Sequence, residues 1–515
     1  MQKETKPVIL LAVLEYGELP ELLRVAEVAT VALQGTATFM FVKHSYRRLA
    51  EDTAAVVAGG FLWMDAQGDT HSVAAPSKVE AISPKVTESI IQVAPVLPSR
   101  AAGRGILGRL RVMALLPLLS IASVASAIGQ ATRQIARDVA NCLRDMRRFR
   151  RRYQELHRLL EKLSPSLLVV GQDSLGGELS FLLIAAGRLN IPRLITPFAM
   201  FTIEETAEFA KSNPRHHVGN GVLNRLAAFA FPHWVLQYQG HRLLRLPGYR
   251  AIALEMTGLV HALPWTSLSE PVEAITAHSK VAADALVALG VERAKLHVTG
   301  SPMNDRLAMH LSERDQLRGR ICAEFGMAAE KPLLVCGWPV NMFAWLSGRH
   351  ISYPDYPAVA MAWANHLADV REKYGVNVIV SIHPKTLAAE IVEVERVGLP
   401  YRMTGTDELI AACDVFTTLN GSSVTAWAIA CGVPTVLFDC FLTCYPDFLN
   451  VPGCVNVETE EEFKNALHLF CGDANARAAL ARRQSEVSQQ WGLLDGQAGV
   501  RLSALMHKLV KDAQT

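Results

Sequence analysis

The sequence has no CxxC pair of the kind found in zinc sites, and its nine cysteines are an odd number. The first feature argues against a zinc site and the odd count argues against a disulfide framework, so free thiols in a reducing, cytoplasmic compartment are expected. Charge of one sign is also lacking, because 51 basic side chains nearly balance 49 acidic ones. A net charge of +2 argues against bulk binding of polyanions, so any affinity for nucleic acid or anionic lipid needs a local cluster.

A signal peptide and internal repeats are absent as well. The first apolar run, residues 8–14, follows Lys3, Glu4 and Lys6 and is ended by Glu15, so it is too short for a signal sequence. We expect it to form a buried strand. Half of the 515 residues are hydrophobic, which is enough for two domains of ordinary size, each with its own core.

Apolar strands alternate with helices in both halves of the chain, which predicts an α/β fold. The first half has strands at 8–14, 37–43, 166–170 and 192–196, with helices at 19–33 and 177–189. The second half has strands at 332–336, 376–382, 415–418 and 434–438, with helices at 358–374, 407–412, 424–431 and 460–470. Strand–helix–strand units require parallel sheets covered on both faces. We predict two Rossmann-like parallel-sheet domains facing a cleft, residues 1–305 and 330–515.

A helical insertion at about 100–162 does not fit a plain sandwich. Residues 112–132 carry no charge, and their length approaches the roughly 20 residues of a spanning helix. Seven arginines then lie between Arg144 and Arg158 with apolar residues among them, which is typical of a helix on an anionic membrane surface. The alternatives are an arm packed on the protein with a solvated basic face, or a true span. The aromatic and basic segment at about 220–264 is a second interfacial patch or a wall of the acceptor site.

Ligands of open parallel sheets bind beyond the carboxyl ends of the strands. One expected strand ends in His383, Pro384 and Lys385, where the imidazole could hydrogen-bond a phosphate or protonate a departing phosphate oxygen. An ordinary histidine at a strand end is the alternative. Gly337 and Trp338 follow another strand and give a weaker signal of the same kind.

The turn Asn420, Gly421, Ser422 and Ser423 separates a strand from an apolar helix. Small residues allow close backbone approach, the helix terminus offers N–H groups, and the two hydroxyls add donors, which suits an anion such as phosphate. A helix capped by one serine is the alternative.

These motifs together resemble the GT-B glycosyltransferase superfamily, most specifically over residues 409–439. His383-Pro384 with Ser422-Ser423 is similar to the HP and serine motifs of bacterial sialyltransferases and Kdo transferases, and of CDP-glycerol glycerophosphotransferases. The resemblance implies that His383 contacts the nucleotide phosphate and that the two serines contact its oxygens. Non-hydrolysing UDP-N-acetylglucosamine epimerases share the scaffold but carry a glycine pair and an HR-type motif at these places.

The first domain is then expected to bind the acceptor and supply a general base. Asp173 follows the strand at 166–170 and could take a proton from an acceptor hydroxyl, or could instead cap the next helix. Its local sequence, QDSLGGE, matches the acidic motif of the sialyltransferases only in part. Other acidic candidates at strand ends are Glu15, Glu18, Glu204 and Glu205. Gly300 and Asp305, in a stretch that looks like the VTGxPxxD of GT-B folds, are expected near the cleft.

The sequence therefore predicts a metal-independent glycosyltransferase without a cofactor, whose nucleotide-sugar donor is its substrate. A CMP-sugar is favoured, and UDP-sugars or CDP-linked polyols stay open. The expected acceptor is a surface polysaccharide or glycolipid at the cytoplasmic face of the membrane, with no role for nucleic acid. An epimerase or hydrolase on the same scaffold, or a non-catalytic membrane-associated scaffold protein, is the alternative.

Overall fold

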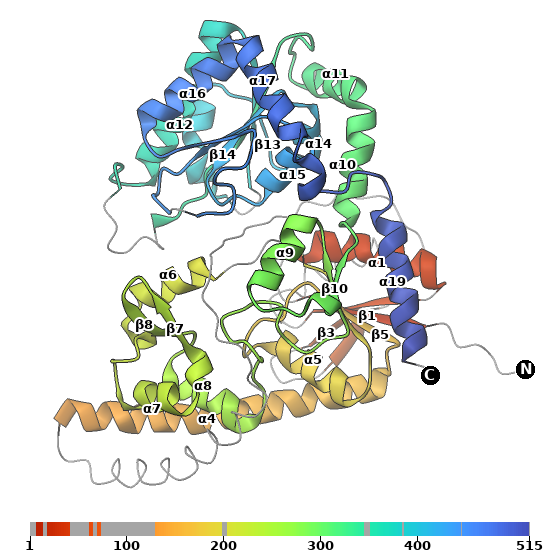
Figure 1. Ribbon diagram of the computed structural model, residues 1–515, viewed down its shortest axis with the longest axis vertical. Coiled ribbons are helices and arrows are strands. Elements are labelled where there is room, and N and C mark those ends of the chain that lie inside the picture. Colours follow the sequence, from red (N-terminus) through yellow and green to blue (C-terminus); the bar gives the residue numbers. More distant parts are fainter. Residues whose placement is uncertain are drawn as a thin grey trace, which may run out of the picture.

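The computed structural model describes residues 7–13, 18–34, 36–41, 61–64, 70–73, 129–197, 203–343, 351–383, 386–443 and 445–513. The predicted site residues Glu15, Pro384 and Lys385 lie outside them, as do residues 112–128 of the charge-free segment. The described chain forms two stacks of sheet and helix, one above the other in Figure 1, and α10 (Pro302–Ser312) lies between them.

The first domain is built on a large parallel sheet. Its strands are β1 (Val8–Val13), β2 (Thr36–Phe41), β3 (Phe61–Met64), β4 (Thr70–Val73), β5 (Leu167–Val170), β6 (Arg193–Ile195), β9 (Ala274–Ala277) and β10 (Leu296–Val298). They lie in the order β10-β9-β6-β5-β1-β2-β3-β4, and only β4 runs antiparallel to its neighbour. The helices are α1 (Leu19–Leu33), α4 (Gly129–Leu163), α5 (Glu178–Arg188), α6 (Glu204–Ser212), α7 (Val222–Ala230), α8 (Gly248–Thr257) and α9 (Lys280–Ala288).

The second domain holds a smaller sheet whose described pairs are all parallel. Its strands are β11 (Leu333–Gly337), β12 (Asn377–Ser381), β13 (Tyr401–Arg402), β14 (Val415–Leu419), β15 (Thr435–Phe438) and β16 (Cys454–Val457), in the order β13-β12-β11-β14-β15-β16. The helices are α11 (Arg314–Glu324), α12 (Tyr356–Tyr374), α13 (Val392–Arg396), α14 (Thr406–Ala412), α15 (Val424–Ala430), α16 (Glu460–Gly472), α17 (Ala474–Ser485) and α18 (Ser488–Trp491). This topology confirms the predicted fold class of two Rossmann-like parallel sheets.

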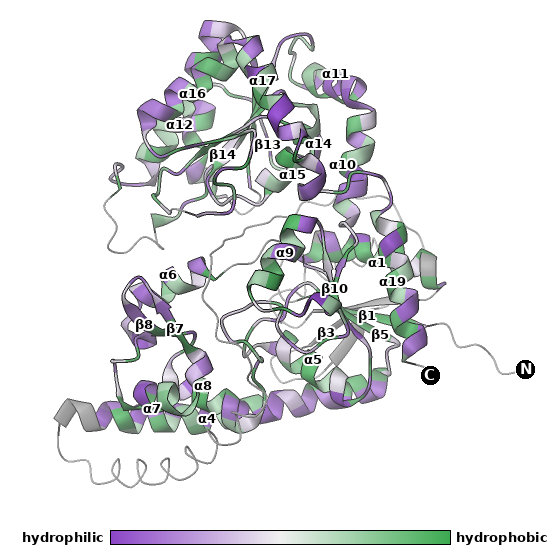
Figure 2. Ribbon diagram, in the orientation of Figure 1, coloured by the Kyte–Doolittle hydropathy of each residue, from purple (hydrophilic) through white to green (hydrophobic). Residues whose placement is uncertain are grey.

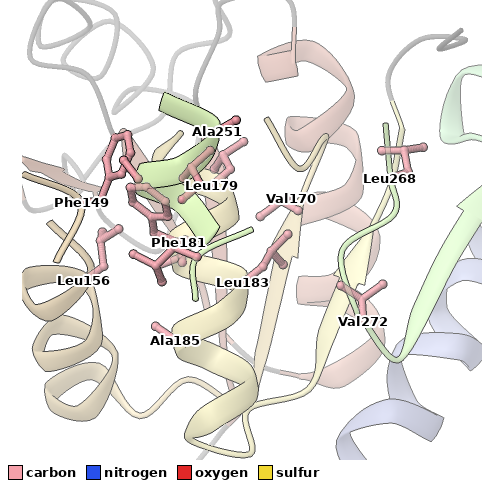
Figure 3. Close-up of a cluster of buried hydrophobic side chains, with 14 of the residues drawn as sticks. Phe149, Leu156, Val170, Leu179, Phe181, Leu183, Ala185, Ala251, Leu268 and Val272 are labelled. Atoms are coloured by element: carbon pink, nitrogen blue, oxygen red, sulfur yellow. The ribbon is translucent and has the colours of Figure 1, made fainter. Parts of the chain in front are cut away.

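Alternate residues of each strand belong to cores on opposite faces of the sheet, as the period of two in a strand requires. In β1, Leu10 and Ala12 face the core shared with α4, α5 and α8, whereas Ile9 and Leu11 face α1. Figure 3 shows part of the first of these cores, where side chains of α4, α5 and α8 converge. Both faces of the sheet are therefore covered, so a ligand-binding site is expected at the carboxyl ends of its strands.

The last helix, α19 (Ala498–Asp512), lies on the first domain although residues 330–515 were predicted to form the second. Leu502 and Met506 are buried in the core that contains α1. Asp305 of α10 fixes the start of α19 by accepting the N–H groups of Ala498 and Gly499 at 2.9 and 2.8 Å. The chain thus passes between the domains twice, once through α10, which packs on both, and once before α19.

The aromatic segment at about 220–264 forms a small unit beside α4. It includes the hairpin of β7 (Val235–Tyr238) and β8 (His241–Leu244), packed with α6, and helix α7, packed with α4 and α8. Phe231 and Trp234 are fully buried, and the Trp234 indole donates to Glu255 at 2.9 Å. These two aromatic residues are therefore part of the core and not of an interfacial patch.

No helix among the described residues combines the length and the apolar character that crossing a bilayer requires. Residues 129–132, the end of the charge-free segment, form the first turn of α4. The predicted basic stretch between Arg144 and Arg158 lies within the same helix, which is 35 residues long.

Candidate active site

The strand order of the second sheet reverses between β11 and β14. Strand β11 is followed along the chain by β12 and β13 on one side, and then by β14, β15 and β16 on the other. Such a reversal opens a crevice at the carboxyl ends of the strands, which is where ligands of open α/β sheets bind. The β11, β12 and β14 strands end at Gly337, Ser381 and Leu419.

The predicted donor residues follow these three adjacent strands. Gly337 is the last residue of β11 and Trp338 follows it, His383 lies two residues after β12, and Ser422 lies three residues after β14. The strand ends of β12 and β14 lie on either side of β11, so they are roughly 10 Å apart, which is two strand spacings. The structure therefore brings His383 and the serine turn to the same edge of one sheet.

The β11 end is tightly packed. A β-carbon on Gly337 would lie 2.7 Å from Oγ1 of Thr418, which itself donates to the Gly337 carbonyl at 3.1 Å. The Trp338 side chain is buried in the core, and its indole donates to the Glu390 carbonyl at 3.1 Å. Trp338 thus shapes the edge through its backbone, and its ring is not presented to a ligand.

The segment after β15 packs against the turn after β14 and is hydrogen-bonded to it. Gly421 has φ +85°, and the Tyr445 ring covers it. The buried Asn420 amide donates to Oδ2 of Asp439 and to the Tyr445 carbonyl, both at 3.3 Å. Asp439 in turn accepts the backbone and hydroxyl hydrogens of Thr443 at 2.8 Å. These bonds fix the conformation of the turn.

The serine hydroxyls are not used to cap α15. Ser423 occupies the N-cap position with helical backbone angles, and its side chain makes no capping hydrogen bond. Ser422 contributes its carbonyl, which accepts the Thr425 N–H at 3.1 Å. Both serines are half-buried, and so is His383, whose carbonyl accepts the Thr386 N–H at 2.8 Å. The simple capping alternative therefore does not describe Ser423.

Asp447 is a candidate that the sequence did not reveal. It is half-buried, and its Oδ2 atom is buried without a hydrogen-bond partner among the described residues. Burial, together with the charge of Glu204 in the first domain, raises the pKa of Asp447 from 3.8 to about 8. An acidic residue directly after a predicted strand can be recognised in a sequence as a candidate site residue. However, Asp447 comes nine residues after the end of β15, so its burial depends on the fold of the intervening segment.

Glu204 and Asp447 come from different domains, so the carboxyl edges of the two sheets face each other here. Glu204 begins α6, after β6, and Asp447 follows β15. Close by, Val281 at the start of α9 packs against a cluster of the second domain that contains Phe448 and Trp491. Elements that follow strands of each sheet therefore meet at the domain junction.

The first sheet also reverses its strand order, between β1 and β5. Glu18 is fully buried there and accepts a hydrogen bond from Gln172, which follows β5. The Asp173 side chain is buried, and its two oxygens accept the N–H groups of Leu268 and Glu270 at 2.9 and 3.0 Å. This arrangement anchors the segment before β9, and it does not present Asp173 to an acceptor.

His261 and Glu270 complete the buried group around Asp173. His261 lies 3.5 Å from Asp173 and 3.1 Å from Glu270, and burial lowers the pKa of its imidazole. Burial, with the nearby charge of Asp173, raises the pKa of Glu270 well above its usual value. Among the described residues, no group of three or more histidine, cysteine and acidic side chains is arranged to hold a metal ion.

His278 is a second residue that the sequence analysis missed. It directly follows β9, and burial lowers the pKa of its imidazole to about 4, so the ring is neutral at physiological pH. Like His383, His278 is a histidine placed just after a strand, which is the pattern from which His383 was predicted. It was missed because β9, only four residues long, was not predicted as a strand.

No family model matches the sequence, and no curated protein does. Among solved structures, the chain is similar to the UDP-GlcNAc 2-epimerase of Neisseria meningitidis bound to UDP-GlcNAc, with 10% identity over 98% of this chain and 100% of that one, and a TM-score of 0.48. The calicheamicin glycosyltransferase CalG4 has 12% identity over 99% of each chain and the same TM-score. A variant of the wall teichoic acid polymerase TagF has 10% identity over 98% of this chain and 89% of its own, again with 0.48. Identities and TM-scores this low do not assign a function to this chain.

Proposed function

We propose that this protein is a glycosyltransferase of the GT-B type that binds a nucleotide-sugar donor at the carboxyl edge of its second sheet. The observation that carries the proposal is the placement of Gly337, His383 and the Ser422-Ser423 turn. They lie at the carboxyl ends of three adjacent strands, β12, β11 and β14, and the strand order reverses between the last two. The motifs at these positions are the ones that resemble bacterial transferases with HP and serine motifs.

The chemistry of the edge suits the departure of a nucleotide from a sugar. Two serine hydroxyls can donate to phosphate oxygens that gain negative charge in the transition state. His383 can donate a hydrogen bond or a proton to the same group. Neutral donors and an imidazole can stabilise this charge without a metal ion, so we propose a metal-independent reaction. A CMP-sugar is the favoured donor, and UDP- and CDP-linked donors are the alternatives.

We assign the acceptor to the first domain. Asp173 was the first candidate for the general base, but both of its oxygens accept backbone hydrogen bonds. Glu204 lies near Asp447 of the second domain, so one of the two carboxyl groups can hold a proton while the other is ionised. This pair is the better candidate for exchanging a proton with an acceptor hydroxyl. The proposed acceptor is a surface polysaccharide or glycolipid at the cytoplasmic face of the membrane.

A screen of nucleotides followed by a turnover assay tests the proposal. One nucleotide among CMP, CDP, UDP and GDP is expected to raise the melting temperature of the protein. The corresponding nucleotide-sugar should be consumed only when a saccharide acceptor is present. Consumption without an acceptor would instead indicate an epimerase or hydrolase, and binding without any turnover would indicate a non-catalytic scaffold protein.

A further inference from the structure

Helix α4 has two opposite faces of different character. Positions spaced alternately by three and four residues face the core, among them Val139, Cys142, Met146, Phe149, Tyr153 and Leu156. Figure 3 shows Phe149 and Leu156 directed toward Phe181 of α5, and the Phe149 and Phe181 rings are 5.5 Å apart. The inner face therefore has a packing role, which leaves the outer face to be explained.

The outer face follows the same spacing and carries one sign of charge. Positions 133, 137, 140, 144, 147, 151, 154 and 158 are all exposed. Six of these eight positions are arginines, the other two are Ala140 and Gln154, and none is acidic. We call the six the arginine stripe: Arg133, Arg137, Arg144, Arg147, Arg151 and Arg158.

Acidic residues of α4 lie beside the stripe or beyond its last arginine, where Glu161 is exposed. Residues 133–162 contain ten basic and four acidic side chains, and three of the acidic ones, Asp138, Asp145 and Glu155, are half-buried beside the stripe. A helix face that is merely solvated usually mixes both signs of charge. Arginines three or four positions apart on the stripe have Cβ atoms about 5–6 Å apart, and the two pairs that are seven positions apart are separated by about 10 Å along the helix. From Arg133 to Arg158 the stripe spans about 38 Å at 1.5 Å per residue, so it forms a long row of positive charge.

The position of α4 suits contact with a flat surface. The helix runs along the side of the first domain that is remote from the second domain (Figure 1). Hydrophilic and hydrophobic residues alternate along it in Figure 2, and Leu143, beside Arg144 and Arg147, is 40% exposed. The charge-free residues 112–132 lead directly into the helix in the sequence. Arginine heads can bind lipid phosphates while their stems and nearby apolar groups reach the acyl boundary.

We propose that α4 docks this protein on an anionic lipid bilayer through the arginine stripe, with the second domain directed away from the membrane. The docking itself does not require that the protein be a transferase. Only its purpose, bringing a lipid-linked acceptor to the first domain, rests on the proposed function.

Co-sedimentation of the full chain with vesicles tests the docking. The vesicles contain either phosphatidylglycerol and phosphatidylcholine or phosphatidylcholine alone, and each is used at low and high salt. The test variant is Arg137→Gln/Arg144→Gln/Arg147→Gln. The matched control, Arg320→Gln/Arg482→Gln/Arg483→Gln, removes the same charge from exposed sites of the second domain. A third variant, with lysine at the three stripe positions, keeps the charge. Melting temperatures and nucleotide binding are measured for all variants.

Wild-type protein, the second-domain control and the lysine variant are expected to bind anionic vesicles and to dissociate at high salt. The stripe variant should bind roughly 100-fold more weakly, since each arginine near an anionic surface contributes about 1 kcal/mol and 1.4 kcal/mol is a factor of ten. Its nucleotide binding should be unchanged, so that failed docking can be told from a failed proposed function. Equal binding by the stripe and control variants would overturn the proposal. So would equal binding to neutral vesicles, or tighter binding to an oligonucleotide at the same phosphate concentration.

Discussion

The ring of Tyr445 lies only 2.5 Å from the place that a β-carbon on Gly421 would occupy. Gly421 also has a left-handed backbone with φ +85°. The glycine therefore meets two requirements at once: it adopts the turn before α15, and it lets the segment after β15 lie on that turn. No other amino acid at position 421 could adopt this backbone without strain and also leave room for the Tyr445 ring.

Gly421→Ala should consequently destabilise the second domain and weaken nucleotide binding. The left-handed backbone costs about 1–2 kcal/mol for a residue with a β-carbon, and overpacking adds about 1–3 kcal/mol. Gly398→Ala is the matched control, because Gly398 has φ +60° and nothing within 4 Å of its β-carbon position. The difference between the two variants in urea denaturation isolates the contact with Tyr445. Equal losses would contradict this account of the turn.

Asp173→Asn should lower stability more than it alters chemistry. An asparagine has one acceptor oxygen, so its amide group would face one of the N–H groups that Asp173 now binds. The expected loss is about 1–3 kcal/mol of unfolding free energy. Asp284→Asn, on the exposed side of α9, should cost little. If Asp173→Asn instead melts like the wild type but has no turnover, the residue is the general base after all.

Asp447→Asn should change how stability depends on pH. Because the pKa of Asp447 is raised from 3.8 to about 8, the folded protein holds this proton more tightly than the unfolded chain does. The contribution of this group is fully present below about pH 4 and is lost as the pH rises through about 8. The melting temperature of the variant relative to wild type should therefore increase between these two pH values and then level off. A difference that does not vary with pH would show that Asp447 is not buried in this way.

Much of the fold could be predicted because its elements have strong local signals. The helix expected at 19–33 is α1 with the same bounds, and the strand expected at 376–382 is β12 to within one residue at each end. Long apolar runs bounded by glycine or proline define such elements regardless of context. Short strands such as β9 and β10 were missed, because a run of three or four residues with only two or three apolar ones can be either a strand or the edge of a helix.

The candidate site could be predicted only where it follows a strand directly. His383 and Ser422 are of this kind, and both lie at the expected edge. The availability of the other candidate residues depends on their burial, which distant parts of the chain determine. Asp173, for example, accepts hydrogen bonds from backbone N–H groups 95 and 97 positions away. The docking of α19 is another example, since the bond between Asp305 and Ala498 joins residues 193 positions apart. An amphipathic pattern predicts that a helix is packed on one face, but it does not say which domain it packs against.

Asp305→Ala tests the attachment of α19. Loss of the two hydrogen bonds to Ala498 and Gly499 should cost about 1–2 kcal/mol, as for other N-terminal caps. Faster hydrogen exchange is expected in both α19 and α1, because the two helices pack together in one core. The control is Asp473→Ala, which removes a similar cap from α17. It should accelerate exchange in α17 alone. Unchanged exchange in α19 after Asp305→Ala would contradict the role of this residue.

The central claim is that His383 and the Ser422-Ser423 turn bind the same phosphate of a nucleotide. Calorimetric titration with the nucleotide that stabilises the protein tests it most directly, using His383→Ala, Ser422→Ala/Ser423→Ala and the combined variant. The control is His507→Ala, at an exposed position of α19. We predict at least tenfold weaker binding for each of the first two, and a combined loss smaller than the product of both, because the groups share one ligand. Wild-type affinity in either variant, or fully independent losses, would contradict the account.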